Sequence, residues 1–329
     1  MPPCSHARCP HLEEAYRGTR ALVLGASGFI GRWVARLLSH YGAGLTLVVR
    51  DPSSAEAIFR DYQISGRMAC LEIESGEGWQ QLIDEIRPSV VFNLIGYGVD
   101  HGENDPERAA RVNERFVQQL GRCLTKAPAG ASWPGMTLVH AGSALEYGSI
   151  GGDLDETSIP RPETLYGQTK LAGTAWLAGY ASSNGLKAIT ARLFTVYGPG
   201  EHPARLLPSL LETASSHRVL PLSAGTQRRD FTFVPDVAEG LLRLGMTPSQ
   251  PGTVVNLATG RLTSVRDFVE IAASVITLPR DLLGFGMIDT RFQEIEHMEV
   301  TLERLKAITG WIPATSIREG VRQTIGWPL

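Results

Sequence analysis

A glycine-rich turn between an apolar segment and a helical one is the strongest constraint on the fold of this chain. Residues 19–25 predict a short buried strand, and residues 29–41 have helical periodicity. Between them, Gly25, Gly28 and Gly31 follow the spacing GxxGxxG. The first glycine permits a tight turn, the second lets backbone amides approach a pyrophosphate, and the third allows the helix to pack closely on the strand. The pattern predicts a βαβ unit with a phosphate-binding turn, although such a turn can also be purely structural.

The order of elements indicates the fold class. From residue 20 to residue 193, apolar strands alternate with amphipathic helices, which predicts an α/β fold with a doubly wound parallel (Rossmann) sheet. The later chain is richer in proline, and residues 253–257 predict a strand that returns to the sheet. We therefore expect a disordered leader, a dinucleotide-binding domain and a smaller, discontinuous C-terminal substrate lobe. The expected boundaries are 1–18 for the leader, 19–198 plus about 227–259 for the domain, and about 199–226 plus 260–329 for the lobe.

Composition excludes several classes of function. The chain has 329 residues, of which 43% are hydrophobic, and this is ample for a buried core. Its net charge of −3 argues against nucleic acid or an anionic membrane as partner. No apolar run has membrane-spanning length, and the N-terminus lacks the core of a signal peptide. A cytoplasmic protein is the resulting expectation.

The cysteines predict neither a disulfide framework nor a metal centre. The chain has four cysteines, which are too sparse for a disulfide scaffold. Cys4, His6, Cys9 and His11 offer four potential zinc ligands within eight residues. Such tight spacing leaves little chain to fold around a tetrahedral ion, so we expect no metal site here.

Tyr166 and Lys170 form a candidate proton-transfer pair. At positions i and i+4 of a helix their side chains lie on one face, where the ammonium can approach the phenol. A free phenol titrates near pH ~10, and a neighbouring cation favours the phenolate. The spacing therefore predicts an acid/base catalyst whose tyrosine is brought toward neutral pH by the lysine.

The end of the second predicted strand indicates which dinucleotide is preferred. Residues 45–49 lead directly into Arg50, where an NAD-binding fold usually carries an acidic residue for the ribose hydroxyls. A guanidinium at this position suits a 2′-phosphate. Because Asp51 follows at once, we expect NADP(H) to be preferred and keep NAD(H) as possible.

Together with these motifs, further segments give the chain a resemblance to a known family. From about Arg20 to the C-terminus it resembles the extended short-chain dehydrogenases/reductases of the nucleotide-sugar epimerase, dehydratase and reductase type. The resemblance implies a homodimer formed through the helices that carry Asn113 and Tyr166. The matching segments are residues 25–31, 91–96, 112–113, 143–148, 166–170, 197–200 and 229–237.

The resemblance also implies roles for individual residues. Ser143 would hydrogen-bond the reacting oxygen and Tyr166 would exchange the proton. Lys170 would hold the cofactor ribose and tune Tyr166, and Asn113 would support the proton path through a backbone distortion and water. Glu72 would contact the adenine amine. The cofactor-binding set implied in this way is Gly25, Ser27, Gly28, Phe29, Ile30, Gly31, Arg50, Glu72, Ile73, Leu94 and Lys170.

The second half of the chain points to the substrate class. Arg229 and Arg291 match phosphate-binding positions of the family, and guanidinium groups bind a diphosphate in a bidentate manner. A nucleoside-diphosphate sugar is therefore the expected substrate. Thr195 stands where relatives often carry Asn, which weakens the expected contact there. The full candidate set for substrate is Tyr97, Glu146, Tyr147, Thr195, His202, Arg229 and Arg291.

Residues that are missing narrow the reaction. Many 4,6-dehydratases of the family carry Asp-Glu directly after the catalytic hydroxyl residue, whereas this chain has Ala144 and Leu145, neither of which can act as acid or base. A 4-ketoreductase or a 4-epimerase remains. Because Arg50 favours NADPH, we expect reduction of a nucleoside-diphosphate 4-keto-6-deoxyhexose with Tyr166 as proton donor. A 4-epimerase with tightly bound NAD is the alternative, and a non-catalytic NADP-binding scaffold or sensor is a third possibility.

Overall fold

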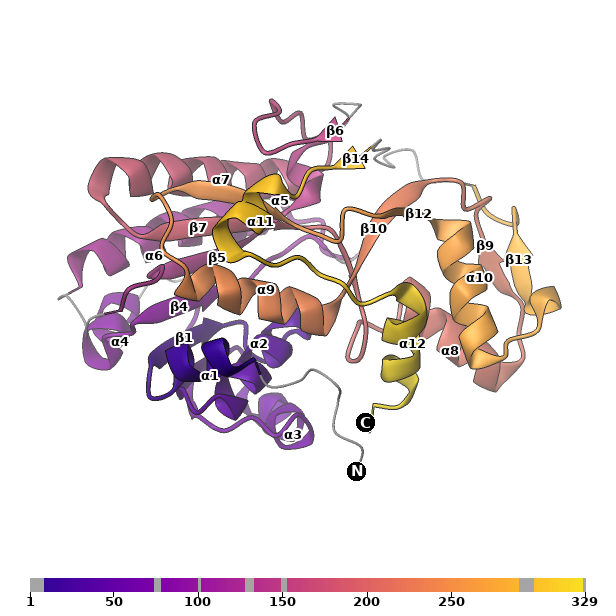
Figure 1. Cartoon of the computed structure of the whole chain (residues 1–329), viewed down its shortest axis with the longest axis horizontal. Helices are drawn as coiled ribbons and strands as arrows, with labels where there is room; N and C mark the ends of the chain where they lie inside the picture. The colour runs from indigo at the N-terminus through magenta and orange to yellow at the C-terminus, as the bar shows by residue number, and fades with distance from the viewer. Residues whose placement is uncertain are drawn as a thin grey trace.

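A seven-stranded parallel sheet forms the centre of the protein (Figure 1). The computed structural model describes residues 9–73, 78–99, 102–127, 133–148, 153–289 and 299–327. Strands with both faces covered have few polar residues, and β1, β4, β5 and β7 are almost continuously buried. In spatial order the strands are β11 (Thr253–Leu257), β7 (Ala188–Leu193), β5 (Leu138–Ser143), β4 (Val90–Asn93), β1 (Arg20–Leu24), β2 (Gly44–Val49) and β3 (Arg67–Cys70).

Helices cover both faces of this sheet, as the predicted doubly wound fold requires. Two hydrophobic clusters, one on each face, fill the space between helices and strands. On the first face lie α1 (Pro10–Tyr16), α2 (Phe29–His40), α3 (Pro52–Asp61), α9 (Val234–Met246) and α11 (Glu303–Thr309). On the second lie α4 (Trp79–Ile86), α6 (Phe116–Lys126) and α7 (Leu165–Asn184), with α5 (Pro106–Ala110) preceding α6.

The strand order reverses between β1 and β4. From β1 the chain proceeds outward through β2 and β3, whereas β4 begins the other half, which continues through β5, β7 and β11. The loops that leave adjacent strands at this point therefore turn away from each other. In open α/β sheets the resulting crevice at the carboxyl ends is where ligands bind. Here it lies between the Gly25 turn and Leu94.

A smaller lobe with its own hydrophobic core lies beside the sheet (Figure 1). Phe231 and Phe268 stack at 4.2 Å between ring centroids in this core. Its helices are α8 (Leu206–Ser216), α10 (Val265–Ile276) and α12 (Ile317–Ile325). Its strands are β8 (Thr195–Tyr197), β9 (Leu220–Leu222), β10 (Arg228–Phe233), β12 (Leu262–Ser264) and β13 (Leu283–Phe285). The short strands β6 (Asp153–Leu154) and β14 (Glu299–Val300) pair with each other.

The boundary between the two units differs from the predicted one at two places. Tyr197, Phe231 and Phe233, which we expected in the dinucleotide-binding domain, are part of the lobe core because β8 and β10 pair with each other. In the opposite sense, Leu305 and Trp327, which we expected in the lobe, pack into the core of the large sheet. The chain therefore crosses between the two cores more often than its motifs indicate.

The prediction of a disordered leader over residues 1–18 is wrong for residues 9–18. Residues 10–16 form α1, in which Leu12 and Tyr16 are fully buried against α9. The Tyr16 hydroxyl donates a hydrogen bond of 2.6 Å to the carbonyl oxygen of Leu242. Tertiary packing thus orders a segment too short to be helical by itself. Cys4 and His6 of the candidate zinc ligands lie outside the described residues.

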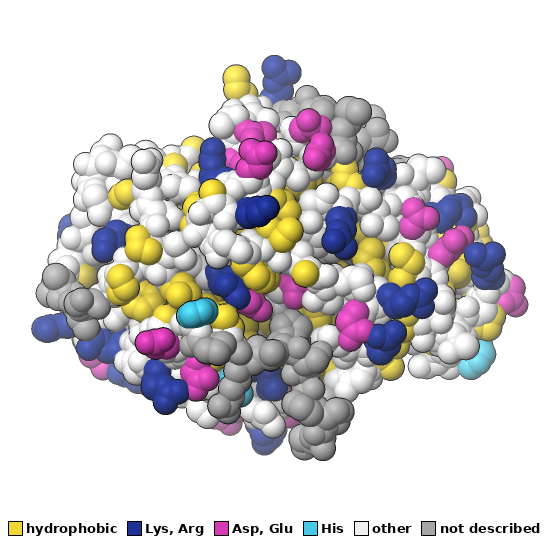
Figure 2. Space-filling view, viewed as in Figure 1, with side chains coloured by type: hydrophobic (Ala, Val, Ile, Leu, Met, Phe, Trp, Pro, Cys, Tyr) yellow, Lys and Arg dark blue, Asp and Glu magenta, His cyan; other side chains and the backbone are white. Residues whose placement is uncertain are grey.

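The surface has mixed charge. Figure 2 shows Lys and Arg side chains interspersed with Asp and Glu over the face in view, as a net charge of −3 would suggest. In the part of the chain that the structure describes, no helix is long and apolar enough to cross a membrane.

Candidate active site

The carboxyl end of β5 and the start of α7 bring Ser143 and Tyr166 together. Ser143 is the last residue of β5 and caps the 3₁₀ turn η2 (Ala144–Glu146). Tyr166 is the second residue of α7, whose N-cap Thr164 accepts a hydrogen bond of 3.0 Å from the Gly167 amide. The Ser143 hydroxyl lies close enough to the Tyr166 phenol to lower its pKa. Both hydroxyl groups that we expected at the reacting oxygen are therefore neighbours.

The environment of Tyr166 favours the protonated phenol. Burial raises the pKa of Tyr166 above its usual value, and the negative charge of Glu146 adds to this effect. The nearby Ser143 side chain and the charge of Arg205 lower the pKa of Tyr166 without outweighing burial. The expectation that Lys170 brings the tyrosine toward neutral pH is not met in this structure, because desolvation of the phenolate dominates.

Lys170, which lies on α7 with Tyr166, is almost completely buried. Its side chain is 2% exposed, and Nζ donates a hydrogen bond of 2.5 Å to the carbonyl oxygen of Ala141 in β5. Burial lowers the pKa of Lys170 to about 8, while the Glu146 carboxylate opposes this shift. The Lys170 ammonium would therefore begin to lose its charge only slightly above neutral pH.

Asn113 lies in a distorted helical segment. Residues Arg111–Arg115 form a π-helix between α5 and α6, and such bulges often occur at functional sites. The Asn113 amide donates to the Tyr97 carbonyl at 2.8 Å and to the Thr169 hydroxyl at 2.9 Å. Its backbone carbonyl presses against α7, where a Cβ on Gly173 would lie 2.1 Å from the Asn113 oxygen. The predicted backbone distortion is therefore present beside the helix that carries Tyr166.

The glycine turn between β1 and α2 is tightly packed and leaves the N-terminus of α2 without a side-chain cap. Gly25 has φ of +76°, and a Cβ on Gly31 would lie 2.0 Å from the Gly25 carbonyl oxygen. Gly28 is the N-cap of α2 and has no side chain to cap it, so the first amides of the helix face outward toward a potential anion. Phe29 and Ile30 begin α2, and the carbonyl of Ser27 accepts a hydrogen bond from Arg32. The residues at the β1–β4 crevice fit a dinucleotide.

The remaining candidate cofactor residues lie at the carboxyl ends of neighbouring strands. Arg50 is exposed directly after β2, and the carboxylate of Asp51 caps α3 by accepting from the Ser53 amide at 3.0 Å. Asp51, because of which NAD(H) stays a possible cofactor, therefore uses its carboxylate to cap α3. Glu72 and Ile73 follow β3, and Leu94 follows β4, where its amide donates to the Leu24 carbonyl at 3.1 Å.

Two residues expected in the sugar pocket are instead buried in the protein. Glu146 is fully buried, and its carboxylate accepts hydrogen bonds from Ser143, Thr174 and Arg192. Tyr147 is also fully buried, and its hydroxyl donates to Asn256 at 2.7 Å in β11. Because 0% of either side chain is exposed, both belong to the support of the site and not to its surface.

The other candidate substrate residues are dispersed around the crevice and the lobe. Tyr97 follows β4, and its amide donates to the Asn113 side chain at 3.0 Å. Thr195 and Arg229 lie on β8 and β10, and His202 is exposed in the loop before α8. Arg291 lies outside the described residues.

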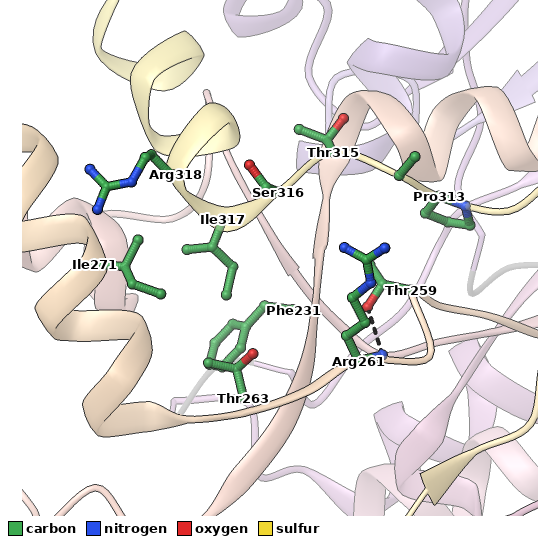
Figure 3. Close-up of a pocket in the computed structure, with 11 residues that line it drawn as sticks. Phe231, Thr259, Arg261, Thr263, Ile271, Pro313, Thr315, Ser316, Ile317 and Arg318 are labelled. Atoms are coloured by element: carbon green, nitrogen blue, oxygen red, sulfur yellow. Dashed lines mark hydrogen bonds between the residues drawn. The ribbon is translucent and has the colours of Figure 1, made fainter.

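The lobe also contains a cavity of about 320 Å³ that no predicted site residue lines (Figure 3). It lies between β10, β12, α10 and the start of α12. In Figure 3, Arg261 and Arg318 extend from different sides of it, and the Arg261 amide is bonded to the Thr259 hydroxyl at 3.1 Å. Neither Ser143 nor Tyr166 lines this cavity.

Sequence patterns missed several groups close to the phenol. A Cβ on Gly96 would lie 3.9 Å from the Tyr166 hydroxyl, and the charges of Glu103 and Arg205 both act on the phenol. Burial raises the pKa of Glu201 to about 8, and Oε2 of this side chain has no hydrogen-bond partner among the described residues. Glu201 directly follows the matching segment 197–200, and this position was a visible signal for it. No local sequence pattern identifies Glu103.

Comparison with known proteins agrees with this geometry. The model of the NAD dependent epimerase/dehydratase family matches residues 21–258. The dTDP-6-deoxy-L-talose 4-dehydrogenase (NAD(P)(+)) of Kitasatospora kifunensis is 28% identical over 325 residues, which cover 95% of this chain and 96% of that protein. The UDP-glucose 4-epimerase of Mycolicibacterium smegmatis is 26% identical over 315 residues, covering 93% and 97%.

A solved structure extends the similarity to three dimensions. MoeE5 in complex with UDP-glucuronic acid and NAD superposes with a TM-score of 0.79 at 28% identity, covering 94% of this chain and 98% of the other. The relatives are NAD(P)-dependent enzymes of nucleotide sugars, and the similarity in three dimensions covers the Rossmann-like sheet with its flanking helices. The chain therefore belongs to the NAD-dependent epimerase/dehydratase family.

Proposed function

We propose that the protein reduces the 4-keto group of a nucleoside-diphosphate 4-keto-6-deoxyhexose with NADPH. The observation that carries the choice of an NADPH-dependent reductase is Arg50, exposed directly after β2, and the buried Tyr166 phenol beside Ser143 suits a proton donor. A related protein, the 4-dehydrogenase of Kitasatospora kifunensis, is named for the oxidation of a dTDP-6-deoxy sugar at C4, the reverse type of reaction.

The cofactor would lie across the β1–β4 crevice. The α2 N-terminus with Gly28 would bind the diphosphate, Arg50 the 2′-phosphate, and Lys170 the ribose of the nicotinamide half. When bound, the nicotinamide supplies the hydride for C4. Glu72 at the end of β3 would contact the adenine.

The chain's own residues would handle the oxygen and its proton. Ser143 would orient the carbonyl oxygen by a hydrogen bond, and Tyr166 would donate its proton as the oxygen gains negative charge. Arg229 and Arg291 would bind the diphosphate of the sugar nucleotide. No acidic or basic side chain follows Ser143 at positions 144 and 145, so elimination of water is not expected.

A 4-epimerase is the second candidate. The 4-epimerase of Mycolicibacterium smegmatis is 26% identical, and the MoeE5 structure contains NAD. Epimerisation needs the same Tyr166 and Ser143 but retains its cofactor through the cycle. Cofactor retention therefore separates the two candidates.

The test begins with the purified protein. We expect denaturation to release no stoichiometric nicotinamide cofactor, and we expect NADPH to bind more tightly than NADH in a fluorescence titration. Oxidation of NADPH at 340 nm with a panel of 4-keto sugar nucleotides should then show turnover. Stoichiometric NAD in the released material would instead support the epimerase, and no turnover with any sugar nucleotide would support a scaffold or sensor.

Arg50 is the residue on which the NADPH preference depends. We expect Arg50→Asp to lower the affinity for NADPH and to raise that for NADH, because a carboxylate repels a 2′-phosphate and can bind ribose hydroxyls. Arg60→Asp, an exposed change on α3, is the matched control for the alteration of charge. An unchanged ratio of the two dissociation constants in Arg50→Asp would show that Arg50 does not determine the cofactor preference.

We also propose a homodimer through α6 and α7. Trp176 stacks on Tyr180 at 4.4 Å between ring centroids, and Arg122 of α6 lies 5.3 Å from the Trp176 ring. This aromatic pair lies on partly exposed helix surface, which suits an interface. Light scattering of Trp176→Glu, compared with the wild type, tests it: a dimer that persists at equal strength would exclude this surface.

A further inference from the structure

Glu146 is the centre of a buried polar cluster beneath the candidate catalytic residues. Oε1 accepts hydrogen bonds from the Ser143 amide at 2.8 Å and from the Thr174 hydroxyl at 3.0 Å. Oε2 accepts from Nε of Arg192 at 2.9 Å, and this ion pair is 0% and 5% exposed at its two side chains. A single carboxylate therefore joins the end of β5, the helix α7 and the strand β7.

The cluster reaches both members of the proton-transfer pair. Thr174 lies one helical turn after Lys170, so the bond to Glu146 holds the carboxylate on the face of α7 that carries the lysine. The negative charge of Glu146 raises the pKa of Lys170 against the effect of burial, and it raises the pKa of Tyr166 as well. A buried ion pair seldom adds net stability, so its place here calls for a role in the site.

We propose that Glu146 is a positioning residue, which fixes the Ser143 turn against α7 and keeps the Lys170 ammonium charged for cofactor binding. The inference rests on the proposed function for the role of Lys170 at the ribose. It does not depend on which sugar is reduced. The hydrogen bond from the Ser143 amide to Glu146 holds Ser143 in place. The negative charge of the Glu146 carboxylate keeps Lys170 protonated.

The other groups around the lysine leave this task to Glu146. His140 of β5 is fully buried, and both burial and the Lys170 charge hold the pKa of His140 well below its usual value, so it is neutral. Arg192 of β7 is paired with Glu146, and Tyr166 of α7 is protonated. The charges of Arg205 and Glu103 act on Tyr166. Among the described residues, Glu146 is therefore the anion that supports the lysine.

The experiment measures how NADPH affinity depends on pH. Titration of the full-length protein by NADPH fluorescence between pH 6 and pH 10 should show affinity falling as pH rises through the pKa of Lys170, near 8 in the wild type. Glu146→Gln keeps the shape and one of the two acceptor oxygens but removes the charge. Loss of a nearby anion favours the neutral amine, so the midpoint should move at least about one unit toward lower pH.

Three further variants separate charge from structure. Lys170→Met should abolish the midpoint, which identifies the titrating group. Thr174→Val removes one hydrogen bond to Glu146 without changing charge, so its midpoint should stay at the wild-type pH. If Glu146→Gln does not fold, as judged by circular dichroism, the pair Glu146→Gln with Arg192→Met removes both charges and should show the same shift.

The outcomes are distinct from those of the proposed reaction. A midpoint that is equal in wild type and Glu146→Gln, or one that persists in Lys170→Met, would overturn the inference. Because the assay needs no sugar nucleotide, a shifted midpoint together with absent turnover would reject the proposed reductase and retain the role of Glu146.

Discussion

At the scale of single residues, Tyr166 carries the proton chemistry of the proposed site. Its phenol is buried, lies beside Ser143 and has a raised pKa that keeps it protonated. A group with these properties can donate a proton to an alkoxide that forms beside it. Proton donation is thus the property to remove in a first test of mechanism.

We expect Tyr166→Phe to lower kcat at least about a hundredfold, because a positioned acid contributes this much or more. NADPH binding should persist, since the phenyl ring fills the same volume. Steady-state kinetics and an NADPH titration check the two parts. Near-normal turnover in the variant, with cofactor bound, would reject Tyr166 as the donor.

Glu201 gives the stability of the protein a defined pH dependence. Its folded-state pKa is raised to about 8 by burial, so ionisation as pH rises weakens the folded state. In Glu201→Gln this loss is absent, and the Tm of the variant relative to wild type should increase between pH 5 and pH 9. Glu212→Gln, an exposed change on α8, is the control. A Tm difference that stays constant with pH would contradict the assignment.

At the scale of elements, the glycine turn shows how close packing fixes a binding geometry. We expect Gly31→Ala to destabilise the protein by about 1–3 kcal/mol, because its Cβ would meet the Gly25 carbonyl at 2.0 Å. NADPH affinity should fall with it. Urea denaturation and a cofactor titration measure both effects.

Gly179→Ala is the matched control for this prediction. Gly179 lies within α7, where an added Cβ has nothing within 4 Å, and alanine there should stabilise the helix by up to about 1 kcal/mol. Equal stability of Gly31→Ala and wild type would show that the turn can open without cost.

Elements with a strong local pattern could be predicted from the sequence, and those fixed by tertiary contacts could not. Residues 45–49 and 253–257 were recognisable as strands because burial on both faces requires apolar runs. The π-helical segment has no such pattern, because its extra residue depends on how Asn113 meets Gly173 of α7. The burial of Glu146 cannot be predicted from local sequence, because its partner Arg192 is 46 positions away in the chain.

At the scale of the whole molecule, the N-terminal helix is part of the core. We expect Leu12→Ala to cost about 2–5 kcal/mol, since Leu12 is fully buried between α1 and α9. Glu14→Ala on the exposed side of the same helix is the control and should be nearly neutral. Urea denaturation measures both, and equal stability of the two variants would indicate that α1 contributes no packing.

The two cores are interleaved along the chain. The last strand of the large sheet is β11, and Trp327 packs into the same core as Leu12. During synthesis, residues from both ends of the chain must therefore be free of the ribosome before that core can close. At roughly 5–20 residues per second, a chain of 329 residues spends on the order of 20–60 s with nascent apolar strands lacking their final partners. Chaperone binding to the emerging polypeptide would protect it over this interval.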